Sequence, residues 1–505
     1  MFGVGDHQQE NSNFPGTSQE SKDCAANEKT EVCIEGHKLC DKDHELQIDN
    51  SATVLEKIAS LYAERLLSDI TLIVGGRQFP AHRLILCASS DVFQVMLMNP
   101  NWTESQETTV NLQEDPACIS TFGDFLKYLY TGKIHINHYT VLPLLTLADK
   151  YNVRDLINLC IDYMCQHIVS AAACNQLISW LQYTLNCGHD RVGQDCHNFI
   201  KWNFQMVTDT EDLISLETDV LISFLTECDL VIHDEFALYS CVAKWLAAQE
   251  QKLKLREDTS NIEEQFKALV TEVMLYIRFP MMSPRQLAEL LLYPLTIRFK
   301  EFFVEKMAVA MAFHSGQKDR VDLAVKTFTY KLFKPRLYTI ETWSASLTVE
   351  NYLNFQCYGI RTLVFSSPAS SSEVFSDKVF DWSVDVYPKG VWFKKFQLIV
   401  WQGTLEMPET ILRTVRLSVM SKDNDTARVN VGILISGMQD GVEHVKTVVQ
   451  KRFVFTESEQ MLNIDNLIPF DELNDIRNKS PYLVGAFCNT LKLQIVITPM
   501  NMLEL

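Results

Sequence analysis

The spacing of apolar residues changes three times along the chain and divides it into four parts. Residues 1–49 carry few large apolar side chains and cannot bury enough surface to offset the entropy of ordering, so we expect a disordered tail. Residues 50–168 mix helical and strand patterns. Residues 169–313 repeat apolar positions at a helical period, and residues 314–505 change to a period of two. The predicted fold class is multidomain α+β.

The strongest strand and turn signal lies near residue 75. Ile70–Val74 is rich in β-branched residues and stops at Gly75-Gly76, a dipeptide suited to a two-residue hairpin turn. A return strand reaches Phe79. Leu84–Met98 then reads as one apolar helix. It ends at Asn99-Pro100, because the residue before a proline avoids the α region.

Helical periodicity dominates two stretches. Ser51–Leu67 carries one apolar stripe and is predicted to be a helix. The third part predicts helices over Ala171–Leu185, Arg191–Phe204, Asp209–Leu216, Asp219–Cys228 and Asp234–Gln249. Asp219 and Asp234 are predicted to cap the N-terminal ends of two of these helices. Lys252–Glu264 is a charged insertion that we expect to be a solvated loop.

The last part predicts an antiparallel β-sandwich. Its clearest strand is Val379–Tyr387, where Trp382, Val384 and Val386 share one face. Further strands are expected over Phe396–Val400, Val415–Met420, Val429–Ile435, Val445–Phe455 and Leu491–Ile497. Many short strands with turn signals between several of them are typical of sandwiches.

Composition narrows the class of function. The formal charge of −19 disfavours nucleic-acid binding, because phosphate contacts need clustered Lys and Arg. No apolar run approaches the roughly 20 residues that cross a bilayer, so no membrane span is expected. Fourteen cysteines without a C-x-x-C pair disfavour a zinc site or a disulfide framework, and they suit a reducing compartment. No catalytic motif is found, and neither enzyme activity nor a cofactor is expected.

The region from Ser68 to Cys160 resembles the BTB/POZ domain. The residues that carry the resemblance are Ser68-Asp69, Phe79, Ala81-His82-Arg83, Leu86, Ser89, Val92-Phe93, Met96-Leu97, Leu129-Tyr130-Thr131-Gly132, Leu145, Ala148-Asp149-Lys150-Tyr151, Leu156 and Cys160. The resemblance implies a homodimer in which the helix before the core packs on its mate. The implied dimer residues are Leu55, Ile58, Leu61, Tyr62, Asp69 and Arg83, the last two as a charged pair. The alternative is a helix that packs on its own domain. His82 could be read as a general base, but in this motif it is expected to serve structure.

The loop after this core carries a further resemblance. Trp102-Thr103-Glu104 is similar to the hydrophobic-x-Glu motif of BTB domains that bind cullin-3. The implied roles are an aromatic anchor for Trp102 and a hydrogen-bond acceptor for Glu104. The alternative is a surface loop whose Trp102 folds onto its own domain. A glycan on the sequon at Asn101 would exclude the cullin.

Two more domains follow by resemblance. A BACK domain over residues 169–313 is indicated by Phe199-Ile200, Asn203-Phe204, Leu225, Asp229-Leu230, Glu235, Trp245-Leu246, Ile277–Pro284 and Leu287. A TRAF-like (MATH) sandwich over residues 314–505 is indicated by Trp382, Val386-Tyr387-Pro388, Gly390, Ile468-Pro469-Phe470, Leu473, Tyr482-Leu483 and Asn489-Thr490-Leu491. The BTB/POZ domain is expected to span residues 50–168.

The order of these domains is similar to that of the BTB/POZ–BACK–TRAF-like family. It implies a non-catalytic, substrate-recruiting adaptor of a cullin-3 ubiquitin ligase, in which the TRAF-like domain recruits a protein substrate that the sequence does not name. Vertebrate members usually begin with a signal peptide, and insect members carry a transport-and-Golgi-organisation name. Met1–Asn13 lacks the basic region and apolar core of such a signal, so we expect a cytoplasmic location. The alternatives are a BTB scaffold outside any ligase, or a secreted glycoprotein modified at Asn101, Asn424 and Asn478.

Overall fold

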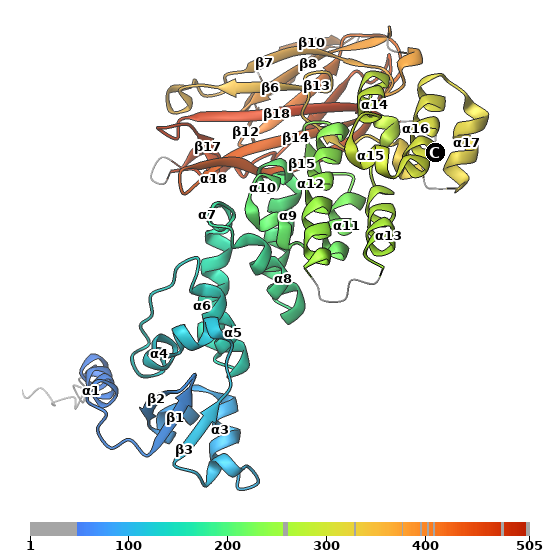
Figure 1. Ribbon diagram of the computed structural model, residues 1–505. Helices are drawn as coiled ribbons and strands as arrows, with labels where there is room; N and C mark the ends of the chain where they lie inside the picture. Colours follow the sequence, from blue (N-terminus) through green and yellow to red (C-terminus); the bar gives the residue numbers. More distant parts are fainter. Residues whose placement is uncertain are drawn as a thin grey trace, which may run out of the picture. The chain divides into compact units, whose positions relative to one another are not determined.

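Figure 1 shows a computed structural model of the chain. It describes residues 48–255, 261–327, 330–375, 377–393, 396–400, 403–407, 410–475 and 479–500. The tail predicted for residues 1–49 lies outside the described residues except for its last two. The sequon residue Asn478 also lies outside them.

The first folded region combines a small sheet with helices. Its three strands follow the order β2-β1-β3, with β1 antiparallel to β2 and parallel to β3. Gly75 and Gly76 join β1 to β2 with φ angles of 56° and 78°, the left-handed values that a type I′ hairpin needs. The elements are α1 (Ser51–Glu64), β1 (Ile70–Val74), β2 (Arg77–Ala81), α2 (Arg83–Ser89), α3 (Asp91–Met98), β3 (Thr109–Leu112), α4 (Pro116–Thr131), α5 (Val141–Lys150) and α6 (Arg154–Gln166).

The single helix expected over Leu84–Met98 is two helices. Ser90 separates α2 from α3 and has an extended backbone. Its hydroxyl accepts a hydrogen bond from the Phe93 N–H and donates one to the Tyr151 carbonyl at 2.5 Å. A serine that caps the next helix therefore outweighs the continuous apolar pattern.

The helical region that follows is longer than its predicted boundary. Its helices are α7 (Ile168–Ala173), α8 (Leu177–Cys187), α9 (Asp190–Trp202), α10 (Phe204–Thr208), α11 (Thr218–Thr226), α12 (Glu235–Lys254), α13 (Ile262–Met274), α14 (Pro284–Leu290), α15 (Pro294–Arg298), α16 (Lys300–His314) and α17 (Lys318–Thr327). Val321 and Ala324 of α17 share a small core with Val309 and Phe313 of α16. Helical packing thus continues beyond residue 314, where the period of two was expected to begin.

Of the helix caps and helix bounds predicted in this region, some are confirmed and others are wrong. The Asp234 carboxylate caps α12 by accepting the Ala237 N–H at 2.7 Å, as predicted. Asp219 does not cap a helix, since α11 begins at Thr218 and Asp219 lies in its first turn. The helix expected over Ala171–Leu185 is broken near Asn175, which takes a left-handed φ of 55°.

The loop expected over Lys252–Glu264 is shorter in the structure than predicted. α12 continues to Lys254 and α13 begins at Ile262. Residues 256–260 lie outside the described part.

The last region contains two facing antiparallel sheets. One has the order β16-β13-β8-β7, and the other has the order β15-β14-β18-β17 with β6 paired to β18. Trp382, Val384 and Val386 of β8 are fully buried between them, as their alternation predicted. The strands are β6 (Ser344–Val349), β7 (Arg361–Pro368), β8 (Val379–Tyr387), β13 (Arg416–Ser421), β14 (Ala427–Gln439), β15 (Val442–Phe455), β16 (Met461–Ile464), β17 (Leu483–Val484) and β18 (Thr490–Pro499). Two ribbons accompany them: β10 (Phe396–Val400) with β11 (Gly403–Met407), and β9 (Val391–Phe393) with β12 (Thr410–Leu412).

Candidate interaction surfaces

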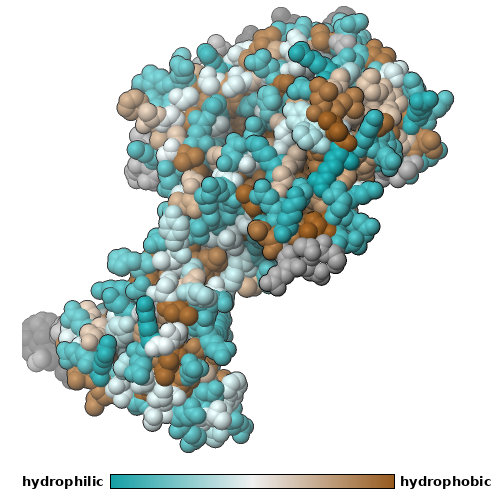
Figure 2. Space-filling model, in the orientation of Figure 1, coloured by the Kyte–Doolittle hydropathy of each residue, from teal (hydrophilic) through white to brown (hydrophobic). Residues whose placement is uncertain are grey.

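Helix α3 is apolar on two faces. Phe93, Met96 and Leu97 are buried in the core of the first region. A second stripe, consisting of Val92, Val95 and Met98 at spacings of three, faces solvent. The face of the molecule that Figure 2 shows is largely polar, with apolar side chains exposed in separate patches. An exposed apolar stripe on a helix whose opposite face already fills a core indicates a contact surface for a partner.

Trp102 and Glu104 lie on the loop that follows this stripe. The Trp102 side chain is 47% exposed, and the short 3-10 helix η1 (Thr103–Ser105) begins directly after it. The Trp102 N–H donates to the Asn99 carbonyl at 3.1 Å, and the Ser105 hydroxyl donates to the Trp102 carbonyl at 2.8 Å. Among the described residues, the Glu104 carboxylate accepts a hydrogen bond only from the neighbouring Thr103 hydroxyl, at 3.0 Å. Hydrogen bonds within the loop help to order it, while Trp102 stays exposed and Glu104 stays partly exposed.

Arg83 at the start of α2 holds this loop in place. Its guanidinium donates to the Leu97 carbonyl at 3.1 Å, to the Glu104 carbonyl at 3.4 Å and to the Glu107 carbonyl. Leu97 and Glu107 lie on either side of the loop that carries Trp102. Sequence reasoning missed this role, because Arg83 is distant from the loop in sequence and its partners are carbonyl groups that any residue supplies.

The charged pair expected between Asp69 and Arg83 takes a different form. The Asp69 carboxylate accepts the backbone N–H of Arg83 at 2.8 Å. The Arg83 guanidinium points to the loop carbonyls instead. Within the described chain, Asp69 therefore fixes the start of α2, and no ion pair links the two side chains.

The α1 residues predicted for the dimer interface do not all face the same way. Leu55 is 54% exposed. Ile58 and Tyr62 pack partly against the core of their own chain, and Leu61 is half-buried. The Tyr62 hydroxyl donates to the Gly123 carbonyl at 3.2 Å. The helix thus uses one side for its own domain and leaves an apolar edge at Leu55.

Both ring nitrogens of His82 have partners. Nδ1 lies 2.9 Å from the Tyr130 hydroxyl, and Nε2 lies 2.6 Å from the Leu66 carbonyl. Burial raises the pKa of Tyr130 to about 12, so its hydroxyl stays protonated. These contacts tie β2 to α4 and support the structural interpretation of His82.

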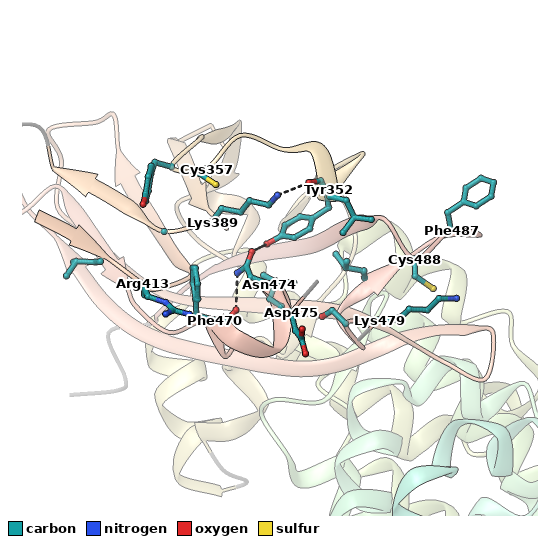
Figure 3. Close-up of a pocket in the computed structure, with 17 residues that line it drawn as sticks. Tyr352, Cys357, Lys389, Arg413, Phe470, Asn474, Asp475, Lys479, Phe487 and Cys488 are labelled. Atoms are coloured by element: carbon teal, nitrogen blue, oxygen red, sulfur yellow. Dashed lines mark hydrogen bonds between the residues drawn. The ribbon is translucent and has the colours of Figure 1, made fainter. Parts of the chain in front are cut away.

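The sandwich contains a cavity of about 510 Å³ (Figure 3). Its walls come from the 3-10 helix η5 (Tyr352–Asn354), the Lys389-Gly390 turn, the segment after β12 and helix α18 (Phe470–Asn474). The Tyr352 hydroxyl donates to the Asn474 side-chain oxygen at 2.9 Å, and the Asn474 amide donates to the Phe470 carbonyl at 3.0 Å. These bonds brace the walls. Sequence reasoning named no residue for this cavity.

Lys389 and Gly390 shape one side of the cavity. The Lys389 ammonium donates to the Leu353 and Phe355 carbonyls at 3.1 and 2.9 Å and lies 5.1 Å from the centre of the Tyr352 ring. Gly390 has a φ of 88°, and a Cβ there would approach the Leu412 carbonyl oxygen to 3.1 Å. Only glycine allows the chain to pass so closely here.

The helical region and the sandwich share contacts. The Asn203 side-chain amide donates to the Val445 carbonyl at 2.9 Å, and its oxygen accepts the Val445 N–H at 2.7 Å. Val445 belongs to β15, the edge strand of its sheet. Asn203 thus completes the backbone hydrogen bonds of this strand at one residue, as a neighbouring strand would.

A buried ionic cluster lies between α12 and the chain that leads to the sandwich. Glu235 and Arg336 are fully buried and form an ion pair at 3.2 Å. Glu235 also accepts the Tyr338 hydroxyl at 2.6 Å and the Arg278 N–H at 2.7 Å. Burial raises the pKa of Tyr338 well above its usual value, so it remains a neutral donor. Tyr338 and Leu337 form β5, which pairs in parallel with β4 (Val231–Ile232).

Within the described residues, a helix with the length and hydrophobicity of a membrane span is absent. In the same residues, no three His, Cys, Asp or Glu side chains gather as metal ligands would.

Three domain families match the chain in the order that the structure shows. Residues 58–168 match the BTB/POZ domain, residues 177–292 match the BTB And C-terminal Kelch (BACK) domain, and residues 333–501 match the BTBD17 TRAF domain. The third match begins after α17, so residues 293–332 fall between the last two domains.

Known proteins resemble the chain over much of its length. BTB/POZ domain-containing protein 17 of Xenopus laevis is 26% identical over 353 residues, which is 68% of this chain and 69% of that protein. The human protein of the same name is 27% identical over 313 residues, 60% of each chain. Galectin-3-binding protein of Mus musculus is 23% identical over 363 residues, 68% of this chain and 60% of that protein.

The chain therefore combines BTB/POZ, BACK and TRAF domains in that order. This is the architecture that the residue-level resemblance implied, and its modules are those of protein–protein interaction. Over much of its length it is similar to BTB/POZ domain-containing protein 17.

Proposed function

We propose that this protein is a substrate-recruiting adaptor of a cullin-3 ubiquitin ligase. The observation that carries the proposal is the exposed apolar stripe of α3, which continues into the exposed Trp102. A cullin helix laid across this surface would bury Val95, Met98 and Trp102 together. Tryptophan is among the residues enriched at interface hot spots, and an amphipathic helix commonly lays its apolar face against apolar side chains of its partner.

Glu104 and Arg83 complete this surface. In the part of the chain that the structure describes, no residue outside the loop donates to the Glu104 carboxylate, so it can accept a donor from the partner. Arg83 fixes the loop before the partner arrives, which lowers the entropy lost on binding. The surface is thus ordered in advance of contact.

Dimerisation would add a second function to the BTB domain. The apolar edge of α1 at Leu55 is exposed in the single chain and would be covered by a mate. Two TRAF domains presented together would raise the affinity for a substrate with two contacts, because the second contact becomes intramolecular.

The BACK domain would act as a spacer between the cullin and the substrate. Asn203 and the Glu235–Arg336 pair link this domain to the sandwich at several points. A substrate held by the TRAF domain would then keep a defined position relative to the cullin.

The second candidate is partner binding outside any ligase, either as an intracellular scaffold or as a secreted glycoprotein. The specific observation in favour of secretion is that the sequon residues Asn101 and Asn424 are both exposed. Relatives named for binding galectin-3 also favour a partner that is not a ligase substrate. A glycan at Asn101 would cover the loop of Trp102, so this candidate and the cullin proposal exclude each other.

The test is to purify the full chain from its native cells and analyse it in two ways. The adaptor proposal predicts that cullin-3 copurifies and that glycosidase leaves the electrophoretic mobility unchanged. A mobility shift on glycosidase treatment, or the absence of cullin-3, would contradict the proposal. The first result would favour the secreted glycoprotein, and the second would favour the scaffold.

A further inference from the structure

The proposed function requires a substrate-docking site on the TRAF domain, and the structure restricts where this site can lie. A peptide could add a strand to a sheet edge, which is a common mode of peptide recognition. On the edge strand β15, however, Asn203 already bonds both backbone groups of Val445. Strand addition would have to break these bonds, so this edge is a poor docking site at that residue.

The cavity of the sandwich is the better candidate. Its volume of about 510 Å³ falls in the range of roughly 300–1,000 Å³ that is typical of ligand sites. Phe470, Leu473 and Leu483 give it an apolar lining. The walls are fixed by the hydrogen bonds of Tyr352 and Asn474, so the cavity exists before any ligand enters.

Part of the cavity lining is apolar and exposed to solvent. Leu353 and Phe487 both belong to this lining and are 62% and 90% exposed. Figure 3 shows the Phe487 ring directed away from the other side chains. An aromatic ring so exposed costs solvation free energy that a partner would recover. This exposed lining fits a peptide segment better than a compact small molecule.

The charged residues of the cavity lining indicate whether an anionic or a cationic ligand would be favoured. Lys389, Arg413 and Lys479 line the cavity, whereas Asp475 is its one carboxylate among the described lining residues. Arg413 pairs with Asp471 at 2.6 Å, and both side chains are largely exposed. No carboxylate of the described residues pairs with Lys389, whose partners are two carbonyl oxygens. A cationic lining in a chain with a formal charge of −19 favours an anionic ligand.

We propose that this cavity docks a short acidic peptide segment of the substrate. The segment would insert an aliphatic or aromatic side chain between Tyr352 and Phe470 and place carboxylates near Lys389 and Lys479. This inference rests on the proposed function, since it assigns the recruiting role of the TRAF domain to a particular site.

The test is fluorescence anisotropy of the full chain with labelled nine-residue peptides. The set varies the central residue among Leu, Phe and Ala and the flanking residues between Glu and Gln. Peptides with an apolar centre and Glu flanks are expected to bind saturably, and peptides with an Ala centre or Gln flanks are expected to bind at least about tenfold more weakly. Raising the salt concentration should weaken the acidic peptides most.

Variants locate the binding within the chain. Lys479→Glu and Phe487→Ala change exposed side chains, so the fold should be retained, and each should weaken the acidic peptides by about tenfold. Lys422→Glu introduces the same charge at an exposed lysine outside the lining and should leave binding unchanged. The proposal is overturned if no acidic peptide binds, or if Lys422→Glu weakens binding as much as Lys479→Glu.

Cullin-3 binding measured on the same preparations separates the two proposals. If no acidic peptide binds while cullin-3 still binds, only the docking-site proposal is contradicted. If the peptides bind but cullin-3 does not, the docking-site proposal stands and the ligase-adaptor proposal is contradicted.

Discussion

The Arg83 guanidinium donates to the backbone carbonyl of Glu104 across 3.4 Å, so the start of α2 is tied to the loop that presents the candidate cullin contact. The same guanidinium reaches the carbonyls of Leu97 and Glu107. One side chain thus connects the end of α3, the 3-10 helix and the chain that leaves it. The position of Trp102 depends on a residue that no partner has to touch.

Replacing Arg83 should weaken cullin-3 binding without removing any contact residue. Arg83→Met keeps most of the apolar stem but loses the three bonds to carbonyl oxygens, so the loop should lose its fixed conformation. We expect about tenfold weaker binding by calorimetry and a loss of about 1–3 kcal/mol in unfolding free energy. Arg77→Met, an exposed arginine on β2, is the control. Equal binding by wild type and Arg83→Met would contradict the positioning role.

Leu55→Asp should separate the dimer into folded monomers. Leu55 is more than half exposed in the single chain, so the substitution should cost the monomer little. In a dimer it would bury an unpaired charge, which costs several kcal/mol. Sedimentation velocity should show a dimer for wild type and for the exposed control Lys57→Asp, and a monomer for Leu55→Asp. A Leu55→Asp dimer would rule out this edge of α1 as an interface.

Glu235→Gln should destabilise the chain strongly. It would leave the Arg336 charge buried without a counter-charge, and removing one partner of a buried ion pair typically costs about 3–5 kcal/mol. Glu263→Gln breaks an exposed pair with Arg298 and should cost at most about 1 kcal/mol. Urea denaturation measures both free energies. Similar costs for the two variants would show that the buried cluster is not needed for stability.

Asn203→Ala should loosen the contact between the BACK domain and β15. It would leave the Val445 N–H and carbonyl without their partner, at a cost of about 1–3 kcal/mol. Hydrogen exchange at the Val445 amide should become faster. Asn198→Ala is the control, because the described partner of the Asn198 side chain is Gln194 of the same helix. Unchanged exchange at Val445 would mean that other contacts hold this strand.

His314 should make the protein less stable as the pH falls below about 6.5, the usual pKa of histidine. Burial lowers its pKa below the usual 6.5. Nε2 lies 2.8 Å from the Met282 carbonyl and Nδ1 accepts the Glu373 N–H at 3.3 Å, so a proton on Nδ1 would break the second bond. The unfolded histidine binds its proton at a higher pH than the folded one. The stabilising contribution is therefore complete above about pH 6.5 and is lost as the pH falls through the folded pKa.

Urea denaturation at several pH values checks this prediction. His314→Gln should reduce the slope of unfolding free energy with pH but not abolish it, because burial also lowers the pKa of His197 and His444. His135→Gln changes an exposed histidine and should leave the slope as it is. An identical slope for wild type and His314→Gln would show that His314 does not titrate as described.

Local signals predicted the parts of the fold that depend on one or two residues. Gly75-Gly76 requires a left-handed turn, Asp234 can cap a helix, and the alternation in β8 fixes which side chains are buried. Breaks within continuous apolar runs were missed, because the Ser90 cap and the left-handed Asn175 interrupt segments whose periodicity suits a single helix.

The candidate site was predicted only where a contiguous motif exists. Trp102 and Glu104 are two residues apart, so a short pattern can identify them. Arg83, Asn203 and the cavity walls act through partners that lie far apart in sequence, and several of those partners are backbone carbonyls. Every residue has a backbone carbonyl group, so the sequence does not indicate which of them accept these hydrogen bonds, and only the fold does.

The most direct test of the adaptor proposal is calorimetric titration of the full chain with the amino-terminal domain of cullin-3. We expect binding that Trp102→Ala and Glu104→Ala each weaken by about 2 kcal/mol or more, the usual size of a hot-spot effect. Trp392→Ala, which removes a tryptophan of similar exposure (43%) from the TRAF domain, should bind as the wild type does. A well-folded dimer that does not bind cullin-3, or that binds equally well without Trp102, would contradict the proposal.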